Sequence, residues 1–142
     1  MTPTPDDQPP SAGGPAPRRT QGAPAPLLVA ASLVAVEALL LVVQGIAEIV
    51  AVSGERVVMG VTTSLFFVAY GAGLALCAWA VTRLRSWARA PIVVAQLIQV
   101  MVAWSFRGGG TTLVAVGLGL LAVVVLAGIF HPASLDALAD ES

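Results

Sequence analysis

Between Pro26 and Pro132 the chain is almost continuously apolar, and only three short polar segments interrupt it. Its seven basic residues are all arginines, and they lie at those interruptions or in the N-terminal tail. Only 11% of the 142 residues are charged, whereas about a quarter are charged in an ordinary soluble domain. The pattern therefore predicts a polytopic helical membrane protein.

A helix crosses the hydrocarbon core of a bilayer with about 20 mostly apolar residues. Four segments meet this requirement, at about 27–52, 57–82, 90–106 and 111–130. The third is near the lower limit, and we expect it to stand upright or to draw on Trp87 to Ala90 for length. The sequence thus predicts an all-α fold with a four-helix transmembrane domain over residues 26–131.

The two ends of the chain differ in composition from the apolar domain. Residues 1–25 hold seven of the ten prolines, which predicts a disordered tail because too little apolar surface is present to offset the entropy of ordering. The first apolar run is far longer than the hydrophobic region of a cleaved signal, so we interpret it as a signal-anchor helix. Residues 132–142 form a short acidic tail, which is either a surface helix or frayed.

The arginines predict the orientation, since short basic loops remain on the cytoplasmic side of a membrane. With the N-terminus inside, the cytoplasmic side holds five arginines and the outer side two. The five are Arg18, Arg19, Arg83, Arg85 and Arg89, and the two are Arg56 and Arg107. We therefore expect a multi-pass protein of the plasma membrane with both termini in the cytoplasm.

Glu37 is the polar residue that most needs an explanation. It lies ten residues into the first span, roughly 15 Å deep and near the bilayer midplane. An acidic residue costs about 3 kcal/mol at that depth on insertion scales, so it must face protein or water. Glu37 is therefore either an interhelical hydrogen-bonding residue that fixes packing or a group that couples proton or cation movement.

Other polar residues fall at similar depths. Gln44 and Glu48 lie on the same side of the first span as Glu37, which predicts a polar stripe facing the other helices. Tyr70 of the second span and Gln99 of the third lie at depths in the membrane that differ from the depth of Glu37 by no more than roughly 5 Å. The candidate intramembrane polar cluster comprises Glu37, Tyr70, Gln99, Gln96 and Gln44.

Glu48 lies near the outer boundary, where Arg107 or Arg56 would reach it. We expect an outer-face ion pair between Glu48 and Arg107 that contributes little energy, because water surrounds it. Small residues on single faces of the second and fourth spans would let helices approach closely, either within the bundle or in a homo-oligomer. They are Gly71, Ala75 and Ala78, and Ala115, Gly119 and Ala122.

Several function classes are disfavoured by composition. The near-zero net charge of −1 argues against nucleic acid as a partner. The single histidine, His131, has no ligating cysteine or second histidine near it, so no metal site is predicted. Phosphate-binding loops, nucleophile elbows and paired catalytic carboxylates are lacking. We therefore expect no catalytic residues, no cofactor and no enzymatic activity.

Three segments resemble a known group of proteins. They are residues 33–39 (LVAVEAL), residues 85–91 (RSWARAP), and Gln96 with residues 103–105 (AWS). Over about residues 27–134 the chain resembles small four-span integral membrane proteins of high-GC actinobacteria, and the R-x-W-A-R-x-P segment is the most specific part. The resemblance implies a plasma-membrane location and a four-helix fold, and it transfers no catalytic residue.

Two functions fit these features. The first is a non-enzymatic structural or accessory protein that packs against itself or a larger membrane complex within the lipid bilayer. The alternative is a small oligomeric proton-coupled transporter using Glu37, because four short spans with an acid in the first are similar to the small multidrug resistance exporters. Tyr70, Trp79 and the residues after Gly45 depart from the motifs of those exporters.

Overall fold

The computed structural model describes residues 22–51 and 57–139. The described part is almost entirely helical, with short turns between the helices, and contains no strand. Its elements are α1 (Ala25–Ala51), α2 (Val57–Thr82), the 3-10 helix η1 (Ser86–Ala88), α3 (Arg89–Ser105), the 3-10 helix η2 (Gly109–Thr111), α4 (Thr112–Ile129) and α5 (Pro132–Ala139).

The prediction of an all-α chain with four helices of membrane-spanning length is confirmed. Each of α1, α2, α3 together with η1, and α4 is long and apolar enough to cross a membrane. Residues Trp87 to Ala90 lie within the helical segment that extends the third span to 20 residues, Ser86–Ser105. The C-terminal segment forms the helix α5, which settles the two alternatives for that region over residues 132–139.

Part of the sequence interpretation concerns residues that the structure does not describe. The disordered tail is predicted for residues 1–25, of which 1–21 lie outside the described ranges. Arg18, Arg19 and Arg56 also lie outside them, together with the last three residues of the acidic tail.

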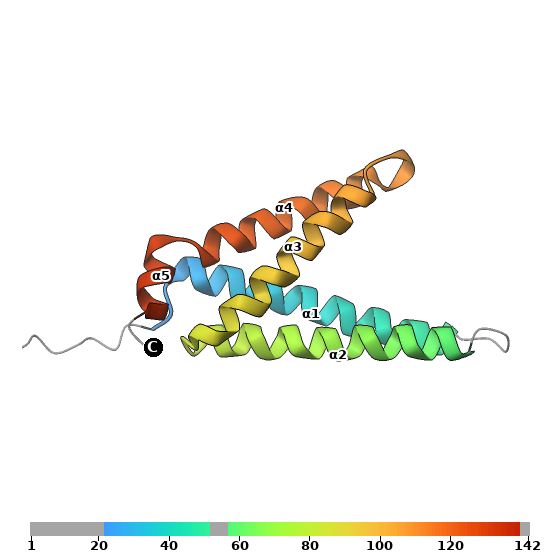
Figure 1. The fold of residues 1–142 in the computed structure, drawn as a ribbon, viewed down its shortest axis with the longest axis horizontal. Coiled ribbons are helices and arrows are strands. Elements are labelled where there is room, and N and C mark those ends of the chain that lie inside the picture. The colour runs from blue at the N-terminus through green and yellow to red at the C-terminus, as the bar shows by residue number, and fades with distance from the viewer. Residues whose placement is uncertain (1–21, 52–56, 140–142) are drawn as a thin grey trace, which may run out of the picture.

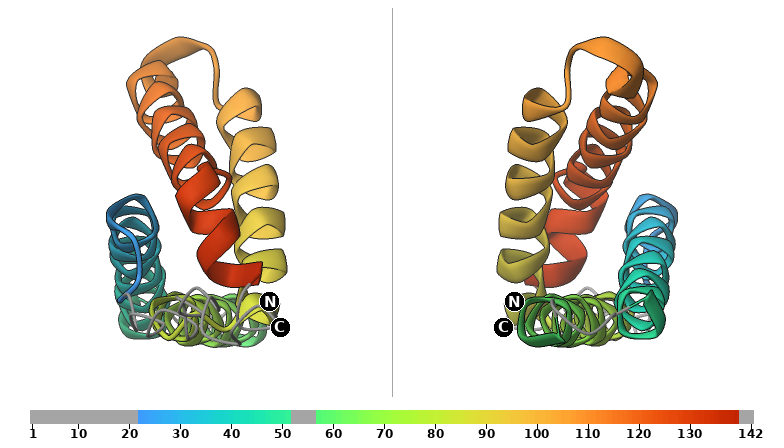
Figure 2. Two further views of the ribbon diagram at one scale, coloured as in Figure 1. Left: turned by 90° about the vertical axis from the view of Figure 1, so that its left-hand side faces the viewer. Right: turned by 90° about the vertical axis from the view of Figure 1, so that its right-hand side faces the viewer.

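The four long helices form two antiparallel hairpins that diverge from a common end (Figure 1). At that end, here called the α5 end, lie the start of α1, the end of α2, the start of α3, the end of α4 and α5. Toward the opposite end, called the far end, the α3–α4 hairpin rises away from the α1–α2 hairpin, as both views in Figure 2 show. The two hairpins therefore pack together over only part of their length.

Three glycines permit close helix contacts that explain this shape. A Cβ atom on Gly71 of α2 would lie 2.8 Å from the Ala38 carbonyl oxygen of α1, and one on Gly45 of α1 would lie 2.9 Å from the Ser64 carbonyl oxygen of α2. These two positions bring α1 and α2 together along most of their length. A Cβ atom on Gly128 of α4 would lie 2.7 Å from the Pro26 carbonyl oxygen, so α4 meets α1 closely only at the α5 end.

The predicted small-residue faces are used mainly inside the bundle. Gly71 and Ala78 are buried, and so are Ala115 and Ala122. Ala75 is exposed instead.

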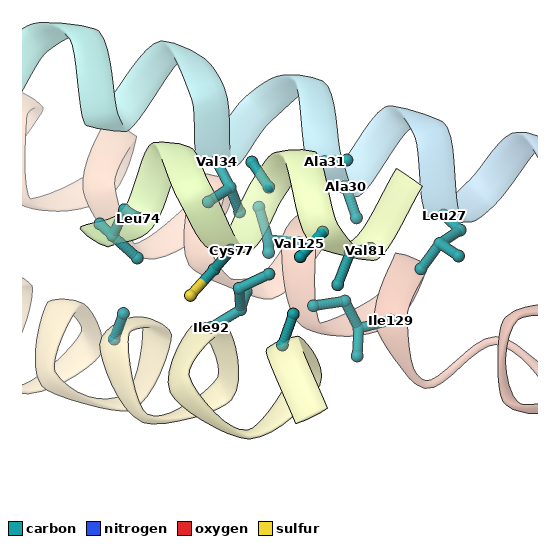
Figure 3. Packing of buried hydrophobic residues seen from close by; sticks show 14 of the residues in the cluster. Leu27, Ala30, Ala31, Val34, Leu74, Cys77, Val81, Ile92, Val125 and Ile129 are labelled. Carbon is teal, nitrogen blue, oxygen red and sulfur yellow. The ribbon is translucent and has the colours of Figure 1, made fainter. Parts of the chain in front are cut away.

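The hydrophobic core lies at the α5 end, where all five α-helices and η1 contribute buried side chains (Figure 3). Leu27, Ile92 and Ile129 are its largest apolar side chains with 0–1% exposure. In a bilayer the outward apolar side chains meet lipid, so the internal core of a membrane bundle is small and rich in alanine. This core holds the start of α3 in place, and the polar residues described next lie beside it.

The connection between α2 and α3 is a compact turn at the α5 end. Leu84 adopts a left-handed conformation with φ of 58°, and the Arg85 amide donates a hydrogen bond to the Ala80 carbonyl, which closes the end of α2. A left-handed residue other than glycine costs about 1 kcal/mol. Leu84 packs against the core, which offsets this cost. The turn places Arg85, Ser86 and Arg89 together where the third span begins.

Candidate functional site

Glu37 lies near the middle of α1 and is only 8% exposed. Its neighbours Val34 and Ala38 are buried core residues, so the same side of α1 carries the core at the α5 end and the carboxylate farther along. The side chain therefore points from α1 into the protein, which is the requirement that its depth in the membrane imposes.

Two amides of α3 bind the two carboxylate oxygens of Glu37. Gln96 Nε2 donates a 2.7 Å hydrogen bond to Glu37 Oε2, and Gln99 Nε2 donates a 3.0 Å hydrogen bond to Oε1. Gln96 is fully buried, and Gln99 is half-buried. Because Gln96 and Gln99 are three residues apart on one face of a helix, a single face of α3 supplies both donors.

The cluster extends to the fourth span. Gln99 Nε2 also lies 3.2 Å from the Leu118 carbonyl oxygen of α4 and donates to it. A side chain of α1, two side chains of α3 and a main-chain group of α4 are thereby joined. We call Glu37, Gln96 and Gln99 the carboxylate–amide cluster.

Tyr70 is close to this cluster but is not bonded to it. It lies near enough to Glu37 to interact electrostatically, yet no hydrogen bond within the described part of the chain joins their side chains. Its ring instead stacks on Phe66, with ring centroids 5.7 Å apart and an interplanar angle of 6°. Of the predicted cluster, the structure therefore brings Glu37, Gln96 and Gln99 into contact and leaves Tyr70 beside them.

Gln44 and Glu48 bond to each other rather than to another helix. Gln44 Nε2 donates a 3.1 Å hydrogen bond to Glu48 Oε1. Both share the Glu37 side of α1 by helical spacing, but Gln44 is exposed and Glu48 half-buried. The reason is the divergence of the hairpins, which takes α3 away from α1 beyond Glu37 (Figure 1).

The expected ion pair between Glu48 and Arg107 does not form. The Arg107 guanidinium lies 3.2 Å from the centroid of the Trp104 ring, an arrangement suited to a cation–π interaction. Arg107 follows α3 at the far end, whereas Glu48 belongs to α1, and these two helix ends are far apart in Figure 1. The sequence predicts that both residues lie at the same end of the bundle, but it carries no information on the separation of the hairpins there.

The carboxylate–amide cluster leaves one polar atom without a partner. Gln96 Oε1 is buried and accepts no hydrogen bond from any residue that the structure describes. A carboxylate accepts through both oxygens, as Glu37 does here, whereas a protonated Glu37 would need an acceptor for its proton. Rotating the Gln96 amide by half a turn would present Oε1 as that acceptor. The cluster is thus chemically able to accommodate Glu37 with or without a proton.

Two buried polar groups escape sequence reasoning, one inside the carboxylate–amide cluster and one outside it. Inside the cluster, the Leu118 carbonyl accepts a hydrogen bond from Gln99, and nothing in an apolar stretch of sequence indicates which main-chain carbonyl does so. Ser64 is fully buried in α2 with its Oγ unpartnered, opposite Gly45, and a serine in an apolar helix gives no indication of which neighbour it faces. In the described part of the chain, no group of three or more His, Cys, Asp or Glu residues is placed to hold a metal ion.

Fold and cluster together define a helical membrane protein with four spans and a buried carboxylate tied to two amides. No family model, curated protein or solved structure matches the chain.

Proposed function

We propose that the protein is a non-enzymatic structural or accessory component of the plasma membrane, with both termini in the cytoplasm. In this proposal Glu37 holds the two hairpins together. The observation that carries it is the pair of hydrogen bonds from Gln96 and Gln99 to the two oxygens of one buried carboxylate. Hydrogen bonds at this position fix the orientation of one hairpin relative to the other.

The energetics support a packing role. Interhelical hydrogen bonds within membranes contribute about 0.6 kcal/mol on average and up to about 2 kcal/mol. Removing one partner of a buried bond costs more, about 1–3 kcal/mol, because the other partner is left unsatisfied. Glu37, Gln96 and Gln99 rely on one another in this way, so loss of the carboxylate would loosen the hairpins.

Two substitutions of Glu37 test the proposal. Glu37→Gln retains two polar atoms of similar shape, whereas Glu37→Leu removes all hydrogen bonding. We expect Glu37→Gln to preserve the oligomeric state of the purified protein and the proteins that co-purify from native membranes, and Glu37→Leu to disrupt both. Ser32→Ala is the matched control, since the Ser32 hydroxyl donates its hydrogen bond to the Leu28 carbonyl within α1. Loss of function in Glu37→Gln with assembly intact would contradict a packing role.

The second candidate function is a small oligomeric proton-coupled transporter. The unpartnered, buried Gln96 Oε1 beside Glu37 favours it. After rotation of the amide, this oxygen would accept a hydrogen bond from a protonated Glu37 carboxyl group. The decisive assay measures proton release from protein reconstituted into liposomes when organic cations are added. Release that Glu37→Gln abolishes would support transport, and no release at any pH would exclude it.

The proposal includes a binding partner for the protein and its resemblance to the four-span actinobacterial proteins. Gln44 and Glu48 are polar and accessible on the side of α1 that faces the diverging hairpin, and polar groups at membrane depth are normally covered by protein or water. We infer that a second copy or a larger membrane complex covers them. The resemblance to the four-span actinobacterial proteins supports the same assignment of location. The oligomeric state of the purified protein, measured together with a pull-down from native membranes, tests this inference.

A further inference from the structure

A cavity of about 350 Å³ lies between the start of the third span and α5. Ser86, Arg89 and Ala90 line it on one side, and Leu135, Leu138 and Ala139 of α5 on the other. Its volume falls in the range of ligand-binding pockets, about 300–1,000 Å³. One wall offers a hydroxyl and a guanidinium group, and the other is apolar.

The charge around the cavity is positive. Arg83, Arg85 and Arg89 lie within seven residues of sequence at the α5 end, and among the residues that the structure describes none of the three forms an ion pair. The Arg83 guanidinium lies 5.0 Å from the Trp79 ring centroid, and that of Arg89 lies 5.8 Å from the Phe130 ring centroid. Stacking on a ring leaves the hydrogen-bond donors at the edge of a guanidinium group available.

Among the described residues of α5, the one carboxylate does not neutralise this charge. Asp136 is the one acidic residue of α5, and it is exposed. The lining residues Leu135, Leu138 and Ala139 share one face of α5, and helical spacing places Asp136 about 100° from that face. Arg89 therefore faces the cavity without a competing carboxylate from α5.

The depth of the cavity matches the headgroup region of a membrane. Ser86 is the first residue of the third span, and Trp87 beside it is 54% exposed. Tryptophan gathers at the membrane–water interface, and basic pockets between transmembrane helices bind anionic lipid headgroups. The apolar wall formed by Leu135 and Leu138 suits the glycerol and upper acyl-chain carbons of the same lipid.

We propose that this cavity is a binding site for the phosphate headgroup of an anionic phospholipid. Arg89 and Ser86 contact the phosphate, and Arg83 and Arg85 raise the local concentration of anionic lipid. The site fastens α5 to the start of the third span through a bound lipid. This proposal is independent of the role of Glu37.

Tryptophan fluorescence tests the site in the full chain reconstituted in nanodiscs. Trp79→Phe with Trp104→Phe leaves Trp87 as the one reporter, since the chain has three tryptophans. We expect brominated phosphatidylglycerol to quench Trp87 more strongly than brominated phosphatidylcholine at the same mole fraction. Equal quenching by the two lipids would overturn the proposal.

Variants separate the site from general surface charge. Arg89→Gln should lower the apparent preference for phosphatidylglycerol about fivefold, since one basic residue near an anionic surface contributes about that factor. Ala90→Phe should lower it as well, because the larger side chain fills the cavity and leaves every arginine in place. Arg107→Gln, which removes the same charge at the far end, should preserve the preference. An equal loss in Arg107→Gln, or no loss in Ala90→Phe, would overturn the proposal.

Two controls keep these results interpretable. Far-UV circular dichroism and size-exclusion chromatography establish that each compared variant retains its fold, so a lost preference with an intact fold reports on binding. Inorganic phosphate is added as a soluble competitor. If it relieves the quenching as well as unlabelled phosphatidylglycerol does, the site recognises free phosphate and the assignment to a lipid is wrong.

Discussion

Gln96 of α3 donates a 2.7 Å hydrogen bond to Glu37 of α1, across 59 residues of sequence and between two hairpins that diverge beyond this point. Glu37 and Gln96 adjoin the core residues Ala38 and Ala95 in sequence, so the bond joins the hairpins beside the hydrophobic core. A buried polar contact at such a position controls how far the hairpins separate. The predictions below test this arrangement and the contacts that surround it.

Gly71→Ala should destabilise the α1–α2 hairpin. The added Cβ would lie 2.8 Å from the Ala38 carbonyl oxygen and 2.9 Å from Val42 Cγ2, so the two helices must move apart. We expect the free energy of unfolding to fall by about 1–3 kcal/mol, as for other overpacked sites. The measurement is SDS-induced unfolding in mixed micelles followed by far-UV circular dichroism.

The control for this prediction is Gly73→Ala in the same helix. A Cβ on Gly73 meets nothing within 4 Å, so Gly73→Ala should not destabilise the hairpin and should raise the free energy of unfolding by at most about 1 kcal/mol. Equal effects at the two positions would show that helix propensity, and not the close approach of α1, determines the stability of the hairpin.

The sequence predicts the four spans well because a stretch of about 20 apolar residues has few alternatives in a membrane. It also predicts the depth that each polar residue reaches, and equal depth predicts a contact between Gln99 and Glu37. Depth and helical face do not determine the crossing angle between hairpins. That angle depends on where backbones meet, and Gly128 brings α4 against α1 only at the α5 end.

This limit explains the differences between the predicted and observed sites. Tyr70 has the right depth for the cluster but its ring stacks on Phe66. Gln44 lies on the same side of α1 as Glu37, yet it is exposed because α3 has diverged at that level. Only an arrangement of helices in three dimensions distinguishes such residues from Gln96, which is fully buried against Glu37.

Ser134→Ala should loosen α5. Ser134 is fully buried, and its Oγ donates a 2.7 Å hydrogen bond to the Gly128 carbonyl at the end of α4. Loss of this bond should cost about 1 kcal/mol of docking energy. In a Cys77→Ala background, a maleimide should then label Leu138→Cys about fivefold faster, since Leu138 is 2% exposed in the docked helix.

Asp136→Cys provides the reference for the labelling rate. Asp136 is exposed on α5, so its labelling should be the same with and without Ser134→Ala. If Leu138→Cys also labels at one rate in both backgrounds, the Ser134 hydroxyl contributes nothing to the docking of α5.

The orientation of the protein is predicted from its arginines. A green fluorescent protein fused to the C-terminus should fluoresce, and alkaline phosphatase fused there should be inactive, because both report a cytoplasmic end. Neutralising Arg83, Arg85 and Arg89 together should produce a mixed orientation, whereas neutralising Arg107 should not. An active phosphatase fusion on the unaltered protein would contradict the proposed topology.

Glu48 and Arg107 should be energetically independent. Glu48 is bonded to Gln44, and Arg107 lies over Trp104, so the effects of Glu48→Gln and Arg107→Gln on the free energy of unfolding should add within about 0.5 kcal/mol. A double-mutant cycle measures the coupling. A larger coupling would mean that the far ends of the hairpins meet in the membrane.

The most direct test of the tie between the hairpins is a double-mutant cycle on Glu37 and Gln96. The variants are Glu37→Leu, Gln96→Leu and the two together, and the measurement is the free energy of unfolding in mixed micelles. We predict a coupling energy of at least about 0.6 kcal/mol, the average for interhelical hydrogen bonds in membrane proteins, and up to about 1.7 kcal/mol, the largest value for such bonds. Effects that add without coupling would contradict the conclusion that Glu37 and Gln96 hold the two hairpins together.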